Sequence, residues 1–288
     1  MMELGSQYKS DDSFKAAARK HQSKYRAEVL QVNYEDYGNR LNENDAKALL
    51  NYYDKLNVRS TLRNRYPSYS KKRDADMLRS EHIPFNLLAP LDTDRLTANK
   101  IICSSFGVDC ASILSIDIEF APDPKNEYLN DGTAFDTYIK ILKPDGKSCG
   151  MGIEVKYTEQ AYKIGVTEKM NIDNNGSLYW KTARSSNAFI DPNGAIFGSD
   201  PLRQIWRNHL LGLSMIQHGD IDEFYSITLF PDGNEHFHNE LRNYTALLKD
   251  DEKEHVIGCT FEKFISAIGG TPDFDEWKEW LKRRYLFK

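Results

Sequence analysis

TAFDTYIKIL at residues 133–142 and CGMGIEVKYT at residues 149–158 decide the fold of this chain. Apolar residues occupy the odd positions of both stretches and mostly polar residues the even positions, which predicts two strands. The connection KPDGK at residues 143–147 carries the Pro and Gly of a hairpin turn. A register that stacks the two apolar rows sets Asp136 opposite Glu154 on an otherwise polar face. Lys156 then lies two residues along on the same face.

Asp136, Glu154 and Lys156 have the make-up of a metal-dependent nuclease centre. Two carboxylates about 4 Å apart repel by roughly 4 kcal/mol at an effective dielectric constant near 20, so a cation between them is favoured. Mg²⁺ binds through one or two carboxylates together with phosphate oxygens. It polarises the phosphorus centre and helps to ionise the attacking water. The lysine adds a compact positive charge that can orient this water or neutralise the transition state.

Carboxylate-x-Lys is nevertheless a common pattern, and this chain also carries it at residues 45–47, 251–253 and 276–278. Spacing alone therefore favours an ordinary solvent-facing strand. Only Glu154-Val155-Lys156 lies in an alternating strand whose hairpin partner carries an aspartate. This context favours the catalytic interpretation.

The run from Thr133 to Asp136, the turn, and then GIEVKY at residues 152–157 together resemble the signature of the PD-(D/E)XK nuclease superfamily. They are most similar to a bacterial branch described as restriction endonucleases, and blocks at 80–86, 201–209 and 277–285 resemble that branch as well. No Pro precedes Asp136, where Phe135 stands, but the superfamily keeps that first letter only loosely. The resemblance implies catalytic roles for Asp136, Glu154 and Lys156, with Mg²⁺ or Mn²⁺ as cofactor. It also implies a restriction-endonuclease-like αβββαβ core.

The rest of the pattern predicts an α/β protein with a mixed α+β sheet. Strands are expected at residues 112–120 and 223–230, the second closing the sheet. Helices are expected at residues 11–35, 44–57, 60–65, 93–106, 201–218, 236–248, 261–268 and 273–285. Residues 157–199 show little apolar periodicity and are expected to form a long loop over the substrate cleft. We therefore predict a basic helical extension at 1–78 and a nuclease-like domain at 79–288.

Two glutamates are candidates for an additional acidic group. Glu119 lies on the polar side of the strand at 112–120 and would be a third metal ligand if that strand pairs beside Asp136. Glu81 competes for this role, because members of the superfamily often place a glutamate on the helix before the sheet. The choice between the two stays open.

The predicted helix at 201–218 supplies further candidates. Gln204, Arg207 and Asn208 share one flank at helical spacing and could hold a water molecule or a backbone phosphate near the metal. Gln204 is therefore a candidate catalytic residue. Arg203 and Arg207 are candidate nucleic-acid contacts.

The net charge of −5 is unevenly distributed along the chain. Residues 1–80 hold 16 Lys and Arg against 11 Asp and Glu, a net charge of +5, whereas the remaining residues carry −10. The densest basic segment is interleaved with Tyr66 and Tyr69, a mixture typical of surfaces that bind phosphates and stack bases. Its candidate nucleic-acid contacts are Arg63, Arg65, Lys71, Lys72 and Arg73. A solvated helix face and loop would explain the same pattern.

The sequence favours a cytoplasmic protein, because it has no apolar block suited to a signal peptide or a membrane span. Its four cysteines form no CxxC pair, so free thiols are expected. The expected function is a metal-dependent nuclease, a DNA endonuclease of restriction or defence type whose partner is nucleic acid. By analogy, a homodimer would cut both strands. The alternative is a catalytically inactive nucleic-acid-binding or scaffolding protein on the same fold.

Overall fold

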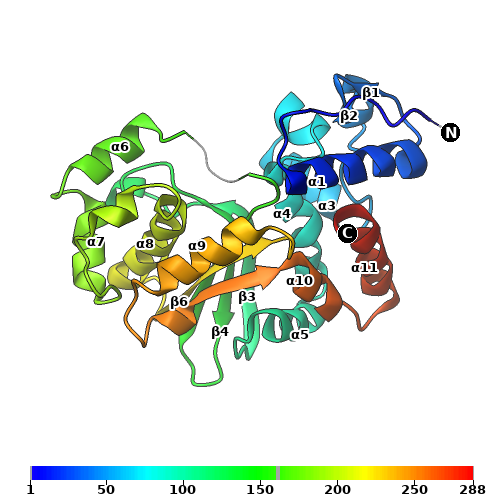
Figure 1. The fold of residues 1–288 in the computed structure, drawn as a ribbon. Coiled ribbons are helices and arrows are strands. Elements are labelled where there is room, and N and C mark those ends of the chain that lie inside the picture. The colour runs from blue at the N-terminus through cyan, green and yellow to red at the C-terminus, as the bar shows by residue number, and fades with distance from the viewer. Residues whose placement is uncertain (1, 160–162, 288) are drawn as a thin grey trace.

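A five-stranded mixed sheet lies at the centre of the computed structural model, which describes residues 2–159 and 163–287 (Figure 1). The strand order is β3-β4-β5-β6-β7; the first three strands are antiparallel, and β6 and β7 continue the sheet parallel to β5. The strands are β3 (Ser112–Phe120), β4 (Phe135–Leu142), β5 (Ser148–Val155), β6 (Glu223–Phe230) and β7 (Val256–Thr260).

The predicted αβββαβ order is confirmed. Helix α5 (Arg95–Phe106) precedes β3, and α8 (Arg203–His218) connects β5 to the parallel strand β6. The expectation that β6 closes the sheet is wrong, because β7 pairs beyond it. With only five residues, β7 is too short to show a clear alternation in sequence.

Both faces of the sheet are buried, which corrects the predicted polar face. One apolar cluster contains Ile139 and Met151 and joins α5, α10 and α11 to the sheet. The second contains Phe135, Tyr138 and Phe224 and packs against α7 and α8. Strict alternation predicted that Phe135 and Ile139 share a face of the sheet. This prediction is wrong, because their side chains belong to clusters on opposite faces.

Two glycines of β5 make the second cluster possible. A Cβ on Gly152 would lie 2.4 Å from the Phe135 ring, and one on Gly150 would lie 2.6 Å from the Tyr138 hydroxyl oxygen. Phe135 and Tyr138 stack with ring centroids 5.8 Å apart over this strip of bare backbone. The two glycines give no signal in the apolar–polar alternation of the sequence, but their lack of a side chain creates the space that the aromatic rings fill.

The amino-terminal extension is only partly helical. The helix predicted at 11–35 ends earlier, as α1 (Ser13–Lys24) and the π-helix η1 (Tyr25–Leu30), followed by a hairpin of β1 (Tyr34–Glu35) and β2 (Tyr37–Leu41). Gln31 and Asp36 have positive φ, which stops the helix and turns the hairpin. After the hairpin come α2 (Glu43–Lys47), α3 (Val58–Arg65), η2 (Lys71–Ala75), η3 (Ser80–His82), α4 (Ile83–Leu87) and η4 (Ala89–Thr93).

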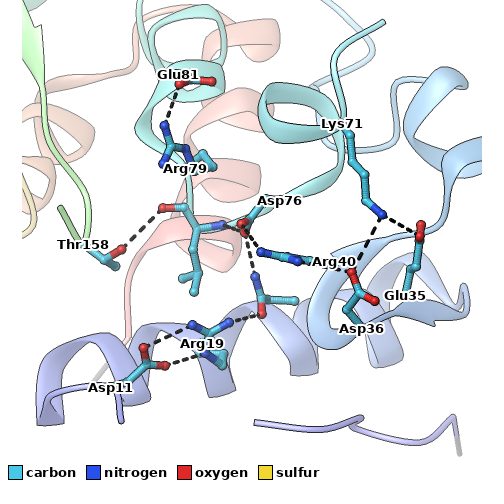
Figure 2. A network of polar contacts seen from close by, with 12 residues as sticks. Asp11, Arg19, Glu35, Asp36, Arg40, Lys71, Asp76, Arg79, Glu81 and Thr158 are labelled. Atoms are coloured by element: carbon cyan, nitrogen blue, oxygen red, sulfur yellow. Dashed lines mark hydrogen bonds and ion pairs between the residues drawn. The ribbon is translucent and has the colours of Figure 1, made fainter. Parts of the chain in front are cut away.

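Polar contacts connect the β2 hairpin to the end of the extension, and the end of the extension to the residues that follow β5 (Figure 2). Asp76 accepts hydrogen bonds from Asn39 and Arg40 of β2, and the Leu78 carbonyl accepts one from Thr158, just beyond β5. Apolar side chains of the extension, Leu62 among them, belong to the same cluster as the sheet. The extension is thus packed onto the sheet domain through shared core.

The segment predicted as a long loop contains two helices, α6 (Val166–Asp173) and α7 (Leu178–Ser186). Tyr179 and Trp180 bury their rings against Trp206 of α8, which explains why so short a helix is stable. The predicted carboxyl-terminal helices are confirmed as α9 (Glu235–Thr245), α10 (Phe261–Ala267) and α11 (Pro272–Tyr285); single turns lie at Lys125–Glu127, Ala195–Gly198 and Lys253–His255. Among the described helices, none has both the length and the apolar composition needed to cross a bilayer.

We expect Gly152→Ala to lower the free energy of unfolding by about 1–3 kcal/mol, because the new methyl group would overlap the Phe135 ring. Gly132→Ala is the matched control, since a Cβ there meets no atom within 4 Å. Urea unfolding of both variants checks this. Equal midpoints for the two variants would contradict the close packing of Phe135 on Gly152.

Candidate active site

Three acidic residues stand in a row across β3, β4 and β5, where these strands meet near the amino-terminal extension. In the β3–β4 register, Ile118 pairs with Thr137 and Phe120 with Phe135, so Glu119 stands across from Asp136. Thr137 pairs with Ile153 in the β4–β5 register, so the next pair along is Asp136 and Glu154. The predicted register of β4 and β5 is confirmed, and β3 does lie beside β4, the condition on which the role of Glu119 depended.

Asp136 is held at the start of β4 by the backbone of the neighbouring strand. Its Oδ2 accepts a hydrogen bond from the Val155 N–H at 2.7 Å. Burial and the nearby Glu154 carboxylate raise the pKa of Asp136 well above its usual value; Glu119 adds to the effect, and the Lys156 ammonium opposes it. The three carboxylates therefore repel one another, as expected where a cation is to bind.

Glu154 and Lys156 form an ion pair, with Lys156 Nζ 2.6 Å from Glu154 Oε1. The second oxygen of Glu154 accepts a hydrogen bond from the Asn208 amide of α8 at 2.8 Å. Lys156 is only 3% exposed. These contacts fix the orientation of the Glu154 carboxylate and keep the ammonium group beside it.

Glu119 combines an unusual backbone with a buried acid. Its φ is +60°, a left-handed conformation that costs of order 1–3 kcal/mol for a residue other than glycine and is often found at functional sites. Burial raises its pKa, although a hydrogen bond from Tyr66 opposes the shift; Glu154 and Glu81 raise it further. Arg65 donates a hydrogen bond to its carbonyl oxygen at 3.0 Å.

Glu81 lies in η3, close enough to Glu119 to influence its pKa. Its carboxylate is 2.6 Å from Arg79 and is partly exposed (Figure 2). Glu119 belongs to strand β3 of the sheet, whereas Glu81 lies in η3, before the sheet begins. Of the two alternatives, Glu119 is therefore the one in line with Asp136 and Glu154.

Gln204 of α8 lines a small cavity together with Glu154, Lys156 and Asn208. It is 8% exposed, and its Nε2 has no hydrogen-bond partner among the described residues. A buried amide donor without a partner is unfavourable, so it marks a place where a bound group would be stabilised. A water molecule or a phosphate oxygen fits this donor.

Arg203 and Arg207 lie on α8, and both form ion pairs that join α8 to α6. Arg203 is 2% exposed and bonds the buried Glu168 of α6 at 2.6 Å and Asp200 at 2.9 Å. Arg207 lies 2.9 Å from the other oxygen of Glu168. Phosphate binding by either arginine would require breaking these ion pairs, so their observed role is to anchor α6 on α8.

The basic residues of the extension divide into two groups. Arg63, Arg65 and Lys72 are exposed. Lys71 bonds Glu35, and Arg73 is buried with its guanidinium 2.7 Å from Asp74. Lys71 is exposed too but is ion-paired, so Arg63, Arg65 and Lys72, which form no ion pair with another described residue, are the ones placed to meet a ligand.

Glu240 of α9 is a buried acid near Lys156 that the sequence analysis missed. It is 3% exposed, contacts His236 one turn earlier on the helix, and is near enough to Lys156 to feel its charge. Burial raises the pKa of Glu240 to about 8, and Lys156 opposes the rise. The spacing His236-x-x-x-Glu240 was the available signal, because residues four apart share a helix face.

Asp136 and Glu154 fit a hard divalent cation. In the described ranges, 2–159 and 163–287, no three acidic, His or Cys side chains already converge as a metal-binding cluster. Mg²⁺, however, needs only one or two protein carboxylates when water and substrate complete its shell. Burial and then the Glu154 carboxylate raise the pKa of Asp136, and such an ion would offset the repulsion between the two carboxylates.

Comparison with known families gives one match. A family model described as PD-(D/E)XK nuclease superfamily matches residues 9–287 of the chain. No curated protein and no solved structure is matched. The match covers the sheet, the acidic row and nearly all of the amino-terminal extension.

We expect Glu240→Gln to remove part of the pH dependence of stability. A carboxyl group whose pKa rises from roughly 4.3 in the unfolded chain to about 8 in the folded protein stabilises the fold fully below the lower value. That stabilisation is lost progressively as pH rises through the higher value. Thermal unfolding from pH 5 to pH 9 should therefore show the parent losing Tm relative to the variant, with a constant difference above about pH 8. A difference that is the same at every pH would contradict the buried neutral carboxyl.

Proposed function

The chain belongs to the PD-(D/E)XK nuclease superfamily, and on that premise we propose that it is a Mg²⁺- or Mn²⁺-dependent endonuclease that cuts DNA, of restriction or defence type. The observation that carries this proposal is the row Glu119, Asp136 and Glu154 across three paired strands, with Lys156 ion-paired to the last. A partly buried group of like charges is unfavourable for stability, and such groups are concentrated at functional sites. Phosphodiester hydrolysis requires such a group.

Asp136 and Glu154 would hold the metal ion, with Glu119 as an additional acidic group. When bound, the ion supplies Lewis acidity to the phosphorus centre and lowers the pKa of the attacking water. Lys156 keeps a positive charge beside the reacting oxygen atoms, where it orients the water and offsets negative charge in the transition state. Asn208 holds Glu154 in the orientation needed for this.

Gln204 is the proposed contact for a water molecule or a non-bridging phosphate oxygen, because its buried amide lacks a partner among the described residues. Arg63, Arg65 and Lys72 are the proposed contacts to the nucleic-acid backbone, since all three are exposed. Arg203, Arg207, Lys71 and Arg73 are left out of this proposal because their charges are already paired. Two copies of the chain would supply one centre for each strand of a duplex.

A catalytically inactive nucleic-acid-binding or scaffolding protein is the second candidate. The observation that favours it is that Asp136 and Glu154 already have protein partners, in Val155, Lys156 and Asn208. Such a protein would keep the basic extension and bind nucleic acid without any metal requirement. Metal binding therefore separates the two candidates.

We expect Asp136→Asn and Glu154→Gln each to reduce metal-dependent cleavage of supercoiled plasmid by about 10²-fold or more, because each removes a charge placed for the transition state. Asp117→Asn is the control, since Asp117 is an exposed acid of the same strand as Glu119. Cleavage should require Mg²⁺ or Mn²⁺ and stop with EDTA. A Glu154→Gln protein that cuts as fast as its parent would disprove the assignment.

Calorimetric titration with Mn²⁺ tests the metal site without any substrate. We expect the parent and Asp117→Asn to bind Mn²⁺, and Asp136→Asn to bind it at least about tenfold more weakly, because one of two anionic ligands is lost. Identical isotherms for the parent and Asp136→Asn would favour the inactive binding protein.

A further inference from the structure

A hollow in the amino-terminal extension lies between α3 and the segment at residues 66–74 and adjoins the acidic row. We propose that this hollow binds an unpaired nucleotide of the nucleic acid on which the protein acts, so that the preferred substrate contains single-stranded nucleic acid. The inference deepens the proposed function and rests on it for the identity of the ligand as a substrate.

The lining of the hollow combines aromatic rings with cations. Its volume is about 330 Å³, within the range of pockets that hold small organic ligands. Tyr66 and Tyr69 contribute their rings, and Arg63 contributes positive charge at its rim; the Lys47 ammonium also lines the hollow but lies 2.6 Å from the Glu43 carboxylate. Aromatic faces beside basic groups are what single-stranded nucleic-acid sites use to stack bases and hold phosphates.

The hollow carries a positive charge that is not fully compensated. Arg63 is exposed and makes no hydrogen bond or ion pair with another described residue. Asp74, the acid in the lining, is already bonded by the Arg73 guanidinium and the Tyr52 hydroxyl, both at 2.7 Å. The charge left over at the rim favours an anion such as a phosphate group.

Tyr69 is the ring best placed to meet a base. It packs on the small core cluster of the extension but is partly exposed, and the ammonium of Lys47 lies 5.5 Å from its ring centroid. Its hydroxyl makes no hydrogen bond with any described residue, so it is free to bond the edge of a base. Tyr66, in contrast, has Arg73 4.4 Å from its ring centroid and packs on Phe85, so it serves as a wall.

The hollow adjoins the candidate active site through Tyr66, which lines it. Tyr66 lies near enough to the Glu119 carboxylate to lower its pKa, and Arg65 next to it donates to the Glu119 carbonyl oxygen at 3.0 Å. A nucleic-acid strand with a phosphate at the acidic row would therefore also run past this hollow, because Tyr66 borders both.

An unpaired base fits these features better than a duplex does. In a duplex the bases are stacked on each other and present only their edges and the phosphates, so they cannot lie against a tyrosine ring. A single strand exposes the flat face of each base, which stacks on an aromatic ring whatever its sequence. The aromatic lining would have no use if only a duplex backbone were bound.

The test is fluorescence anisotropy of the full chain in EDTA, with three labelled probes of equal length: a single strand, its duplex and a strand of abasic nucleotides. The single strand is supplied as DNA and as RNA, and the strand that binds with the lower dissociation constant identifies the kind of nucleic acid that the hollow prefers. We expect Tyr69→Ala to weaken binding of the single strand roughly 5- to 100-fold, the usual loss for one base–aromatic stack. The same variant should bind the duplex and the abasic strand like its parent.

Arg63→Ala provides a second variant whose folding is not at risk, because the side chain is exposed and without partners in the described chain. It should reduce the slope of log affinity against log salt concentration by about 0.7 for single strands. Lys100→Ala, which removes an exposed charge from α5, is the control and should leave binding unchanged. An unchanged slope in Arg63→Ala would overturn the proposal.

The proposal would also be overturned if Tyr69→Ala lost the same affinity for the base-bearing and the abasic strands, or lost no affinity at all. Cleavage by the parent with Mn²⁺ is measured in parallel. A parent that cuts while Tyr69→Ala binds normally refutes the hollow alone. A parent that never cuts, while Tyr69→Ala loses affinity for bases only, refutes the nuclease and leaves the nucleotide-binding hollow standing.

Discussion

The antiparallel pairing of β4 with β5 is the constraint on which the site depends. Because side chains alternate along a strand, a shift of one residue in the pairing would move Asp136 away from both Glu154 and Lys156. The register is held by more than the hairpin turn: Phe135 and Tyr138 fit over Gly150 and Gly152 only in this alignment. The same packing that builds the core therefore aligns the carboxylates.

Repulsion within the acidic row is balanced by groups from three other parts of the chain. Lys156 beyond β5 and Asn208 of α8 hold Glu154, while Tyr66 and Arg65 of the extension hold Glu119. The amino-terminal extension is thus a wall of the site as well as a neighbour of the sheet. Its polar contacts around Asp76, seen in Figure 2, keep that wall in position against the end of β5.

The sequence predicted the features that depend on local periodicity. The hairpin, its register and the αβββαβ order follow from alternation and turn chemistry, and so does the pairing of Asp136 with Glu154. It could not predict that Phe135 changes face, because this depends on the empty space at Gly152 in another strand. Nor could it show that Arg203 and Arg73 are buried, since their partners Glu168 and Asp74 become visible only once the helices pack.

The outer edge of the sheet at β3 is covered by arginine side chains. Arg95 donates to the carbonyl oxygen of Leu114, and Arg65 donates to that of Glu119. An uncovered edge strand recruits further strands, and charged side chains along it discourage such recruitment. The arginines at β3 therefore disfavour the continuation of the sheet into a second copy across this edge, so the acidic row stays at the end of a closed edge.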